Sequence, residues 1–439
     1  MLKKIVYAGS NNPSFQRSSQ DLLVLAEVTV SAKQVERLTE QIGAERCAER
    51  DAVVAAYLAQ PLAQREEPPP AVTPPPVAVA EMDGGRLQIR SAAEEESNET
   101  PPAGTPTPQG PRPAASVPNV ADPSPATRPE PDDEVDRPAQ SKHWREDKVG
   151  CLLAMSSPVS EADPCPDIPS VFVDPFKALT LAQQIGQCAV PPGTPFQKAQ
   201  PQGEEPSAEE RQQRPNRPEI QTRHVLASRQ DVSQFGPLLA AVACALGLFA
   251  AVRRAFVADG SSENWSIYKR YFPRWTAVLD FVHALTYVYA AAMAGRAFVA
   301  GWPVYERWIR WVWAGQVQRV IEELTTRQQE VGMPSKQDKE GSPRRVVQEA
   351  LTYLSNHQDK MHYDEYRKQG LPLMSSHVES TVKQINYRVK GTEKFWSEEG
   401  AEAILQLRAD YLSDDEPMED FWQRRQAAAT GQRRYRRSA

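Results

Sequence analysis

The amino-acid sequence predicts an α/β protein with a mixed-sheet core, an N-terminal helical unit, a long proline-rich insertion and a helical insertion late in the core. Two apolar runs end in an aspartate, Asp83 and Asp259, as strands do when they carry a side chain into a site. Helix-like periodicity precedes the first run and follows the second. Between them lies a low-complexity region, because 30 of the 39 prolines fall from Pro68 to Pro218.

Residues 1–66 are expected to be helical. Ser31 and Gln34 match a capping box, and apolar residues from Val35 to Ile42 recur at helical spacing before Gly43. Two short helices with a brief break would suit a helix-turn-helix unit that docks on DNA. A helical hairpin packed on the core fits the same pattern equally well.

The segment 77–90 is predicted to be the first core strand. It begins as an apolar run, reaches Asp83, passes the pair Gly84 and Gly85, and then alternates between apolar and polar residues. This pattern indicates a strand that carries Asp83 inward and continues beyond the glycines.

The proline-rich region divides into two parts. Residues 91–142 have no periodicity and few aromatic residues, so we expect a disordered insertion. Residues 143–232 are expected to be partly ordered, with a second strand at 148–155 and a short helix near 178–185.

Residues 233–400 are predicted to hold the dense core. The 18 residues 235–252 carry no charge and reach the lower length limit of a membrane span, but Pro237 and the many alanines favour a buried helix. The other expected elements are strands at 255–258 and 277–279, a helix at 263–271, a long helix from Phe281 continued by 302–313, and helices at 346–369 and 376–390. Residues 401–439 are expected to form a helical end and a basic tail.

Composition places the chain in a reducing compartment. Its five cysteines form no C-x-x-C pair and lack histidines at zinc-like spacing, which indicates free thiols in the cytoplasm. The N-terminus has no apolar region long enough for a signal peptide. The net charge of −6 argues against a protein that simply coats polyanions, although the arginines from Arg424 to Arg437 could contact phosphate or remain solvated.

Three acids stand in an order that suits metal-dependent phosphoryl transfer. Asp83 and Asp259 end apolar runs, and Glu379 lies on a later helix. Two Mg²⁺ ions about 3.5–4 Å apart can clamp the attacking and leaving oxygens, and carboxylates are the ligands they prefer. Asp280 also ends an apolar run and therefore competes with Asp259 for the second position. It stands three residues before His283, either to orient the site or as a structural pair at a helix start. No second histidine at useful spacing supports His283 as a ligand.

Several strings resemble the Kra-type bacterial insertion-sequence transposases, which are similar to Mutator-like DDE transposases. These strings are EMDGGRLQIR at 81–90, WREDKVG at 144–150, DG at 259–260, LDFVHA at 279–284, YLSN at 353–356, GLP at 370–372, SSHVES at 375–380 and KGTEKFW at 390–396. The block from Gly370 through Asn386 to Trp396 is highly specific, and the resemblance covers roughly residues 20–425.

The resemblance implies an RNase H-like catalytic core in which Asp83, Asp259 and Glu379 bind Mg²⁺, with Mn²⁺ as a substitute. It makes Asp280 and His283 an accessory motif. The implied partners are double-stranded DNA, at element ends and target, and further copies of the chain in a homodimer or larger assembly. A cytoplasmic, nucleoid-bound enzyme without a membrane segment is expected.

Other side chains on and after the Glu379 helix are candidate DNA contacts, namely Lys383, Arg388, Lys390 and Lys394. Solvated surface charge is the alternative.

Trp265 and Trp396 could stack on bases, but core packing is favoured for both. Related transposases carry more sequence before the helical unit, so part of the region that binds element ends is expected to be missing. Two further hypotheses stay open: a truncated remnant that binds DNA without cutting, and an RNase H-like nuclease that uses the same acids but does not join ends.

Overall fold

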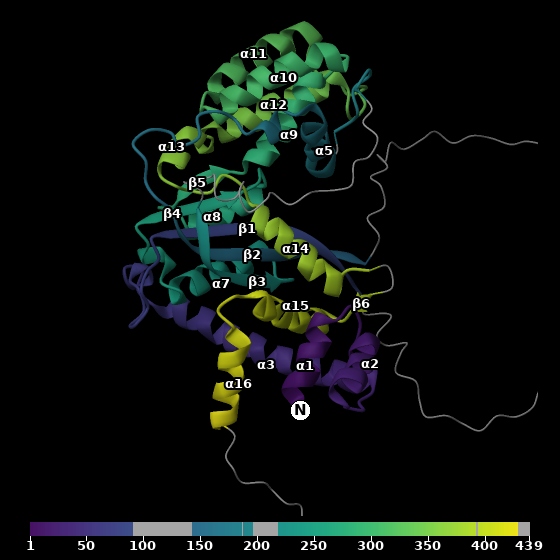
Figure 1. Ribbon diagram of the computed structural model, residues 1–439, viewed down its shortest axis with the longest axis vertical. Coiled ribbons are helices and arrows are strands. Elements are labelled where there is room, and N and C mark those ends of the chain that lie inside the picture. Colours follow the sequence, from purple (N-terminus) through teal and green to yellow (C-terminus); the bar gives the residue numbers. More distant parts are fainter. Residues whose placement is uncertain (91–142, 187, 196–217, 392–393, 429–439) are drawn as a thin grey trace, which may run out of the picture.

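The computed structural model describes residues 1–90, 143–186, 188–195, 218–391 and 394–428 (Figure 1). The insertion predicted at 91–142 and the arginines from Arg433 onward lie outside these ranges.

A six-stranded mixed sheet forms the centre of the fold. Its path is β3-β2-β1-β4-β5, with the short β6 paired to the far end of β1. The pairs β1–β2 and β2–β3 are antiparallel, whereas β4 is parallel to both β1 and β5. The strands are β1 (Val77–Ile89), β2 (Trp144–Ser156), β3 (Glu219–Ser228), β4 (Arg253–Ala258), β5 (Thr276–Leu279) and β6 (Phe395–Trp396). The predicted α/β class and mixed sheet are therefore confirmed.

The strand β3 is missing from the sequence prediction, which placed loop up to residue 217 and no strand before the core helix. Its first six residues are exposed or half-buried, and only Val225 to Ser228 are buried. An edge strand of this kind lacks the apolar run that makes β1 visible in the sequence, because half of it faces solvent.

Helices cover both faces of the sheet. Cys151 of β2 lies 3.3 Å from the Thr381 hydroxyl, so α14 (Ser376–Val389) covers the face that carries Cys151. A methyl group on the neighbouring Gly150 would lie 3.0 Å from Leu239, so α7 (Val232–Ala245) covers the opposite face. Nine of the fourteen residues of α7 are buried, as predicted for a core helix. Within the described ranges, no helix has the length and apolarity needed to cross a membrane.

The N-terminal unit packs beneath the sheet in Figure 1, beside α15 and α16. Ser31 caps its third helix by accepting from the Gln34 NH, as the capping box predicts. That helix is not short, since it runs through Gly43, where the absence of a side chain allows close contact with Ala403 of α15. The helices concerned are α1 (Leu2–Asn11), α2 (Phe15–Ala26), α3 (Ala32–Ala59), α15 (Glu398–Leu412) and α16 (Pro417–Ala428).

A helical insertion lies at the other end of the molecule, between β5 and α14 (Figure 1). The prediction of one long helix from Phe281 to Trp313 is wrong, because the chain turns at Gly295, whose φ is +68°. The insertion contains α9 (Phe281–Met293), α10 (Phe298–Trp313), α11 (Val317–Val331), α12 (Pro343–His357) and α13 (Tyr363–Lys368). The remaining helices are α5 (Pro175–Gly186) and α8 (Ser262–Tyr271).

Candidate active site

Three aspartates stand at corresponding positions on or directly after three neighbouring parallel strands. The pairing of β1 with β4 ends at Glu81 and Val257, and Asp83 and Asp259 each lie two residues beyond that pair. The pairing of β4 with β5 ends at Ala258 and Leu279, which Asp259 and Asp280 directly follow. Neighbours in a parallel register share one face and are about 4.8 Å apart in the hydrogen-bonding direction. The sheet therefore brings together three acids that are far apart in the sequence.

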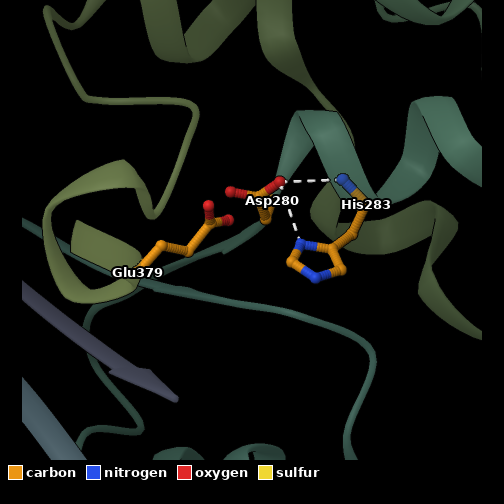
Figure 2. A group of neighbouring side chains, drawn as sticks. All are labelled: Asp280, His283 and Glu379. Carbon is orange, nitrogen blue, oxygen red and sulfur yellow. Dashed lines mark hydrogen bonds and ion pairs between the residues drawn. The ribbon is translucent and has the colours of Figure 1, made fainter. Parts of the chain in front are cut away.

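Glu379 approaches these aspartates from the helix α14, which covers one face of the sheet. It lies in the first turn of α14. Figure 2 shows its carboxylate beside Asp280 and His283, and one ligand atom of each of these three residues lies within 4.8 Å of the others. Asp280, His283 and Glu379 thus form one close group, and Asp83 and Asp259 lie near enough to interact with it electrostatically.

Asp280 is buried and fully engaged. It is the N-cap of α9, and its Oδ1 accepts from the His283 NH at 2.8 Å and pairs with His283 Nδ1 at 3.2 Å. Its Oδ2 accepts from the NH and the hydroxyl of Ser375, at 2.6 and 2.8 Å. Burial favours the neutral acid, but these donors prevail and lower the pKa of Asp280. The contact at a helix start is therefore present, and a role of the pair in orienting the site stays a prediction.

His283 carries a proton at neutral pH. Burial would lower its pKa, but the hydrogen bond and charge of Asp280, with smaller contributions from Asp259 and Glu379, raise the pKa to about 9. A protonated imidazole is a poor metal ligand and a good counter-charge. His283 therefore offsets the negative charge of the surrounding acids.

Asp83 and Asp259 are half-buried and keep free capacity. Asp83 Oδ1 accepts from the Gly84 NH at 2.7 Å. Asp259 Oδ1 accepts from the Ser261 NH at 2.9 Å and from the Asn264 amide at 2.8 Å. Among the described residues, the second oxygen of each carboxylate has no hydrogen-bond partner. Both are therefore available to a ligand.

Repulsion among the acids is visible in their pKa values. Burial raises the pKa of Asp83, and the charges of Asp259 and Asp280 raise it further. Burial, Asp280 and Asp83 do the same for Glu379, against the lowering effect of His283 and Lys383. A bound divalent cation would relieve this repulsion.

Asp83 and Asp259 border a polar cavity of about 390 Å³. Basic, acidic and amide side chains form the rest of its lining. The lining residues are Asp83, Gly84, Gly85, Arg86, Glu146, Lys148, Asp259, Ser261, Glu263, Asn264, Asn386 and Lys390.

Two sets of residues could be considered for a metal. Asp280, His283 and Glu379 have the closest ligating atoms, but both oxygens of Asp280 already accept hydrogen bonds, and His283 Nδ1 lies 3.2 Å from Asp280 Oδ1. Asp83, Asp259 and Glu379 offer oxygens that are free or half-exposed, which suits Mg²⁺. The second set therefore fits a hard divalent cation better.

The four candidate DNA contacts separate into two groups. Lys383 and Lys390 are exposed, and Lys394 is half-buried. Arg388 is only 1% exposed, donates to the Gly9 carbonyl at 3.0 Å and lies against the rings of Phe15 and Trp396. The expectation that Arg388 contacts phosphate is therefore wrong. The helical spacing contained this signal, since Arg388 follows the buried Ile385 by three residues.

Both tryptophans belong to the core, as favoured from the sequence. Trp265 is 4% exposed and Trp396 is 7% exposed. The sequence analysis overlooked two buried acids that flank Asp83 on the α14 face, Glu81 and Asp147. Glu81 could have been noticed as a charged residue within an apolar run, whereas nothing in the sequence marks Asp147.

Comparison with known proteins adds no relative. No protein-family model matches the chain, and a search of curated proteins gives no match.

Proposed function

We propose that this protein is a DNA transposase with an RNase H-like catalytic core, which cuts insertion-sequence ends and joins them to target DNA. The observation that carries the proposal is the convergence of Asp83, Asp259 and Glu379 from two adjacent parallel strands and the helix that covers them. The sheet order β3-β2-β1-β4-β5, in which β2 runs antiparallel to the other described strands, also suits an RNase H-like core. The motif resemblance around these residues adds the transposase assignment.

Asp83, Asp259 and Glu379 would hold the Mg²⁺ ions, which supply Lewis-acid stabilisation for displacement at phosphorus. In the first reaction, water attacks a phosphodiester at the element end, and the bond to the 3′ oxygen breaks to free a 3′-hydroxyl. In the second, that hydroxyl attacks a target phosphodiester and displaces its 3′ oxygen. Each reaction exchanges one P–O bond for another.

Other residues of the chain orient the reactants. The protonated His283 lies beside the acids and could contact a phosphate oxygen. Arg86, Lys148 and Lys390 line the cavity next to Asp83 and could hold the DNA backbone. These roles require double-stranded DNA as the partner, and two copies of the chain would act on the two element ends.

The test uses duplexes that carry the genomic sequence on either side of the gene, incubated with the full chain and Mg²⁺. We compare the parent with Glu379→Gln and with Glu399→Gln, whose exposed glutamate occupies the first turn of α15 instead of α14. A transposase gives cleaved and joined products with the parent and Glu399→Gln, and neither with Glu379→Gln.

Two other outcomes would overturn the proposal in different ways. Cleavage without joined products would indicate an RNase H-like nuclease. Binding of the duplexes by a folded chain, without metal-dependent cleavage, would indicate a DNA-binding remnant.

A further inference from the structure

The N-terminus of α14 has an unusual anchor. The residue at its N-cap, Ser375, makes no capping bond with its own side chain, because its hydroxyl donates to Asp280 instead. The first NH groups of a helix have no partner within the helix and need acceptors from elsewhere. Here two carboxylates from the sheet supply them.

Glu81 is one of these two acceptors. It lies on β1 two residues before Asp83, so the side chains of both residues point to the face that α14 covers. Its side chain is completely buried, and its Oε2 accepts from the Val378 NH at 2.9 Å. Asp280, after β5, holds the Ser375 NH at 2.6 Å. The first turn of α14 is therefore fixed to the sheet at two points, one on either side of Asp259.

Glu379 directly follows Val378, the residue that Glu81 holds. Movement of the first turn would displace the Glu379 carboxylate from Asp83 and Asp259. A buried carboxyl group costs free energy unless it gains a compensating interaction. The bond from the Val378 NH compensates Oε2 of Glu81, whereas Oε1 has no hydrogen-bond partner among the described residues.

We propose that Glu81 is a positioning residue that holds the first turn of α14, and with it Glu379, near the three aspartates. The inference rests on the proposed function, since it assumes that Glu379 shares a metal with Asp83 and Asp259. Glu81 itself touches neither metal nor DNA in this account. It acts through the Val378 backbone.

The first experiment is amide hydrogen exchange on the metal-free chain, because it reads the anchor without any activity. Glu81→Met keeps the bulk but removes the acceptor, whereas Glu81→Gln keeps a carbonyl oxygen. We expect exchange at Val378 to be about tenfold faster in Glu81→Met and close to the parent in Glu81→Gln, with Ile385 unchanged in both. Val79→Ala, a buried change on the same strand, controls for general destabilisation and should not single out the first turn.

The second experiment titrates Mn²⁺ into the same variants. Glu81→Met should need about tenfold more Mn²⁺ for half-saturation, and Glu81→Gln should restore the parent value. Unchanged exchange at Val378, or equal Mn²⁺ affinity in Glu81→Met and the parent, would overturn the positioning role of Glu81 and leave the proposed function intact. If the parent itself binds no Mn²⁺, the proposed function fails and the positioning role falls with it, even where the exchange data show the anchor.

Discussion

Asp259 and Asp280 directly follow the last paired residues of neighbouring parallel strands, yet their surroundings are opposite. Asp280 is 1% exposed, and its two oxygens accept from His283 and Ser375. Asp259 borders a polar cavity, and only one of its oxygens is engaged among the described residues. A saturated carboxylate holds the fold, whereas an unsaturated one can bind a ligand. Position in a sheet alone does not separate these roles, but hydrogen-bond saturation does.

The largest effect that follows concerns Asp259→Asn. Asparagine keeps an Oδ1 acceptor for the Ser261 NH and the Asn264 amide but removes a negative ligand. We expect metal-dependent DNA cleavage to fall by roughly 10³-fold, while the free energy of unfolding changes by less than about 1 kcal/mol. Single-turnover cleavage and urea denaturation measure the two quantities. A large loss of stability would mean that Asp259, like Asp280, is structural.

Asp280→Ala should have the reverse profile. It leaves the His283 NH and the Ser375 NH and hydroxyl without their acceptor, in a buried place. We expect a loss of about 3–5 kcal/mol in the free energy of unfolding, measured by urea denaturation. The control is Asp231→Ala, which removes the exposed N-cap of α7 and should cost only about 1 kcal/mol. An equal loss in the free energy of unfolding for the two variants would contradict a special structural role of Asp280.

Asp147 sharpens the comparison, because it is buried like Asp280 but lacks its donors. Its side chain is 0% exposed and neither oxygen has a partner among the described residues. Burial, with a contribution from Glu146, raises its pKa to about 7 from 3.8. The folded state therefore binds the proton more tightly, so stability is lost as pH rises from about 4 to 7.

Asp147→Asn removes this dependence. We expect the variant to match the parent near pH 4 and to exceed it at pH 8, by up to about 4 kcal/mol. Urea denaturation across this range measures the difference. A constant difference at all pH values would show that Asp147 does not titrate in this way.

The His283–Asp280 pair gives a smaller effect in another pH window. The folded pKa of His283 is raised to about 9 from 6.5, so its stabilisation is fully present below pH 6.5 and is lost as pH rises to about 9. The loss should reach at most about 3 kcal/mol. His283→Gln should reduce the slope of the stability profile between pH 6.5 and 9 and leave the Asp147 window unchanged. A smaller slope remains up to about pH 8, because the pKa of the buried Glu81 is raised to about 8. A parent profile that is already flat above pH 7 would contradict the ion pair.

Local patterns in the sequence were enough to predict β1, the capped start of α3 and the acids that end strands. They did not predict features that depend on exposure in the folded chain or on contacts between residues far apart in the sequence. The edge strand β3 is half solvent-exposed, so its residues do not alternate clearly. The saturation of Asp280 depends on Ser375, 95 residues later in the chain. Nor could the sequence reveal that Glu81 accepts from α14, since 297 residues separate the partners.

The most direct measurement is Mn²⁺ binding, by calorimetry or by the electron paramagnetic resonance of the free ion. The first variant, Asp259→Asn, changes the carboxylate that has an oxygen free of hydrogen bonds within the described part of the chain. The second, His283→Gln, changes the partner of Asp280, whose two oxygens both accept hydrogen bonds. The account predicts that Asp259→Asn abolishes binding, and that His283→Gln retains it or strengthens it, because a positive charge beside the acids is lost. Binding that survives Asp259→Asn but is lost in His283→Gln would place the metal on Asp280, His283 and Glu379 and contradict the account.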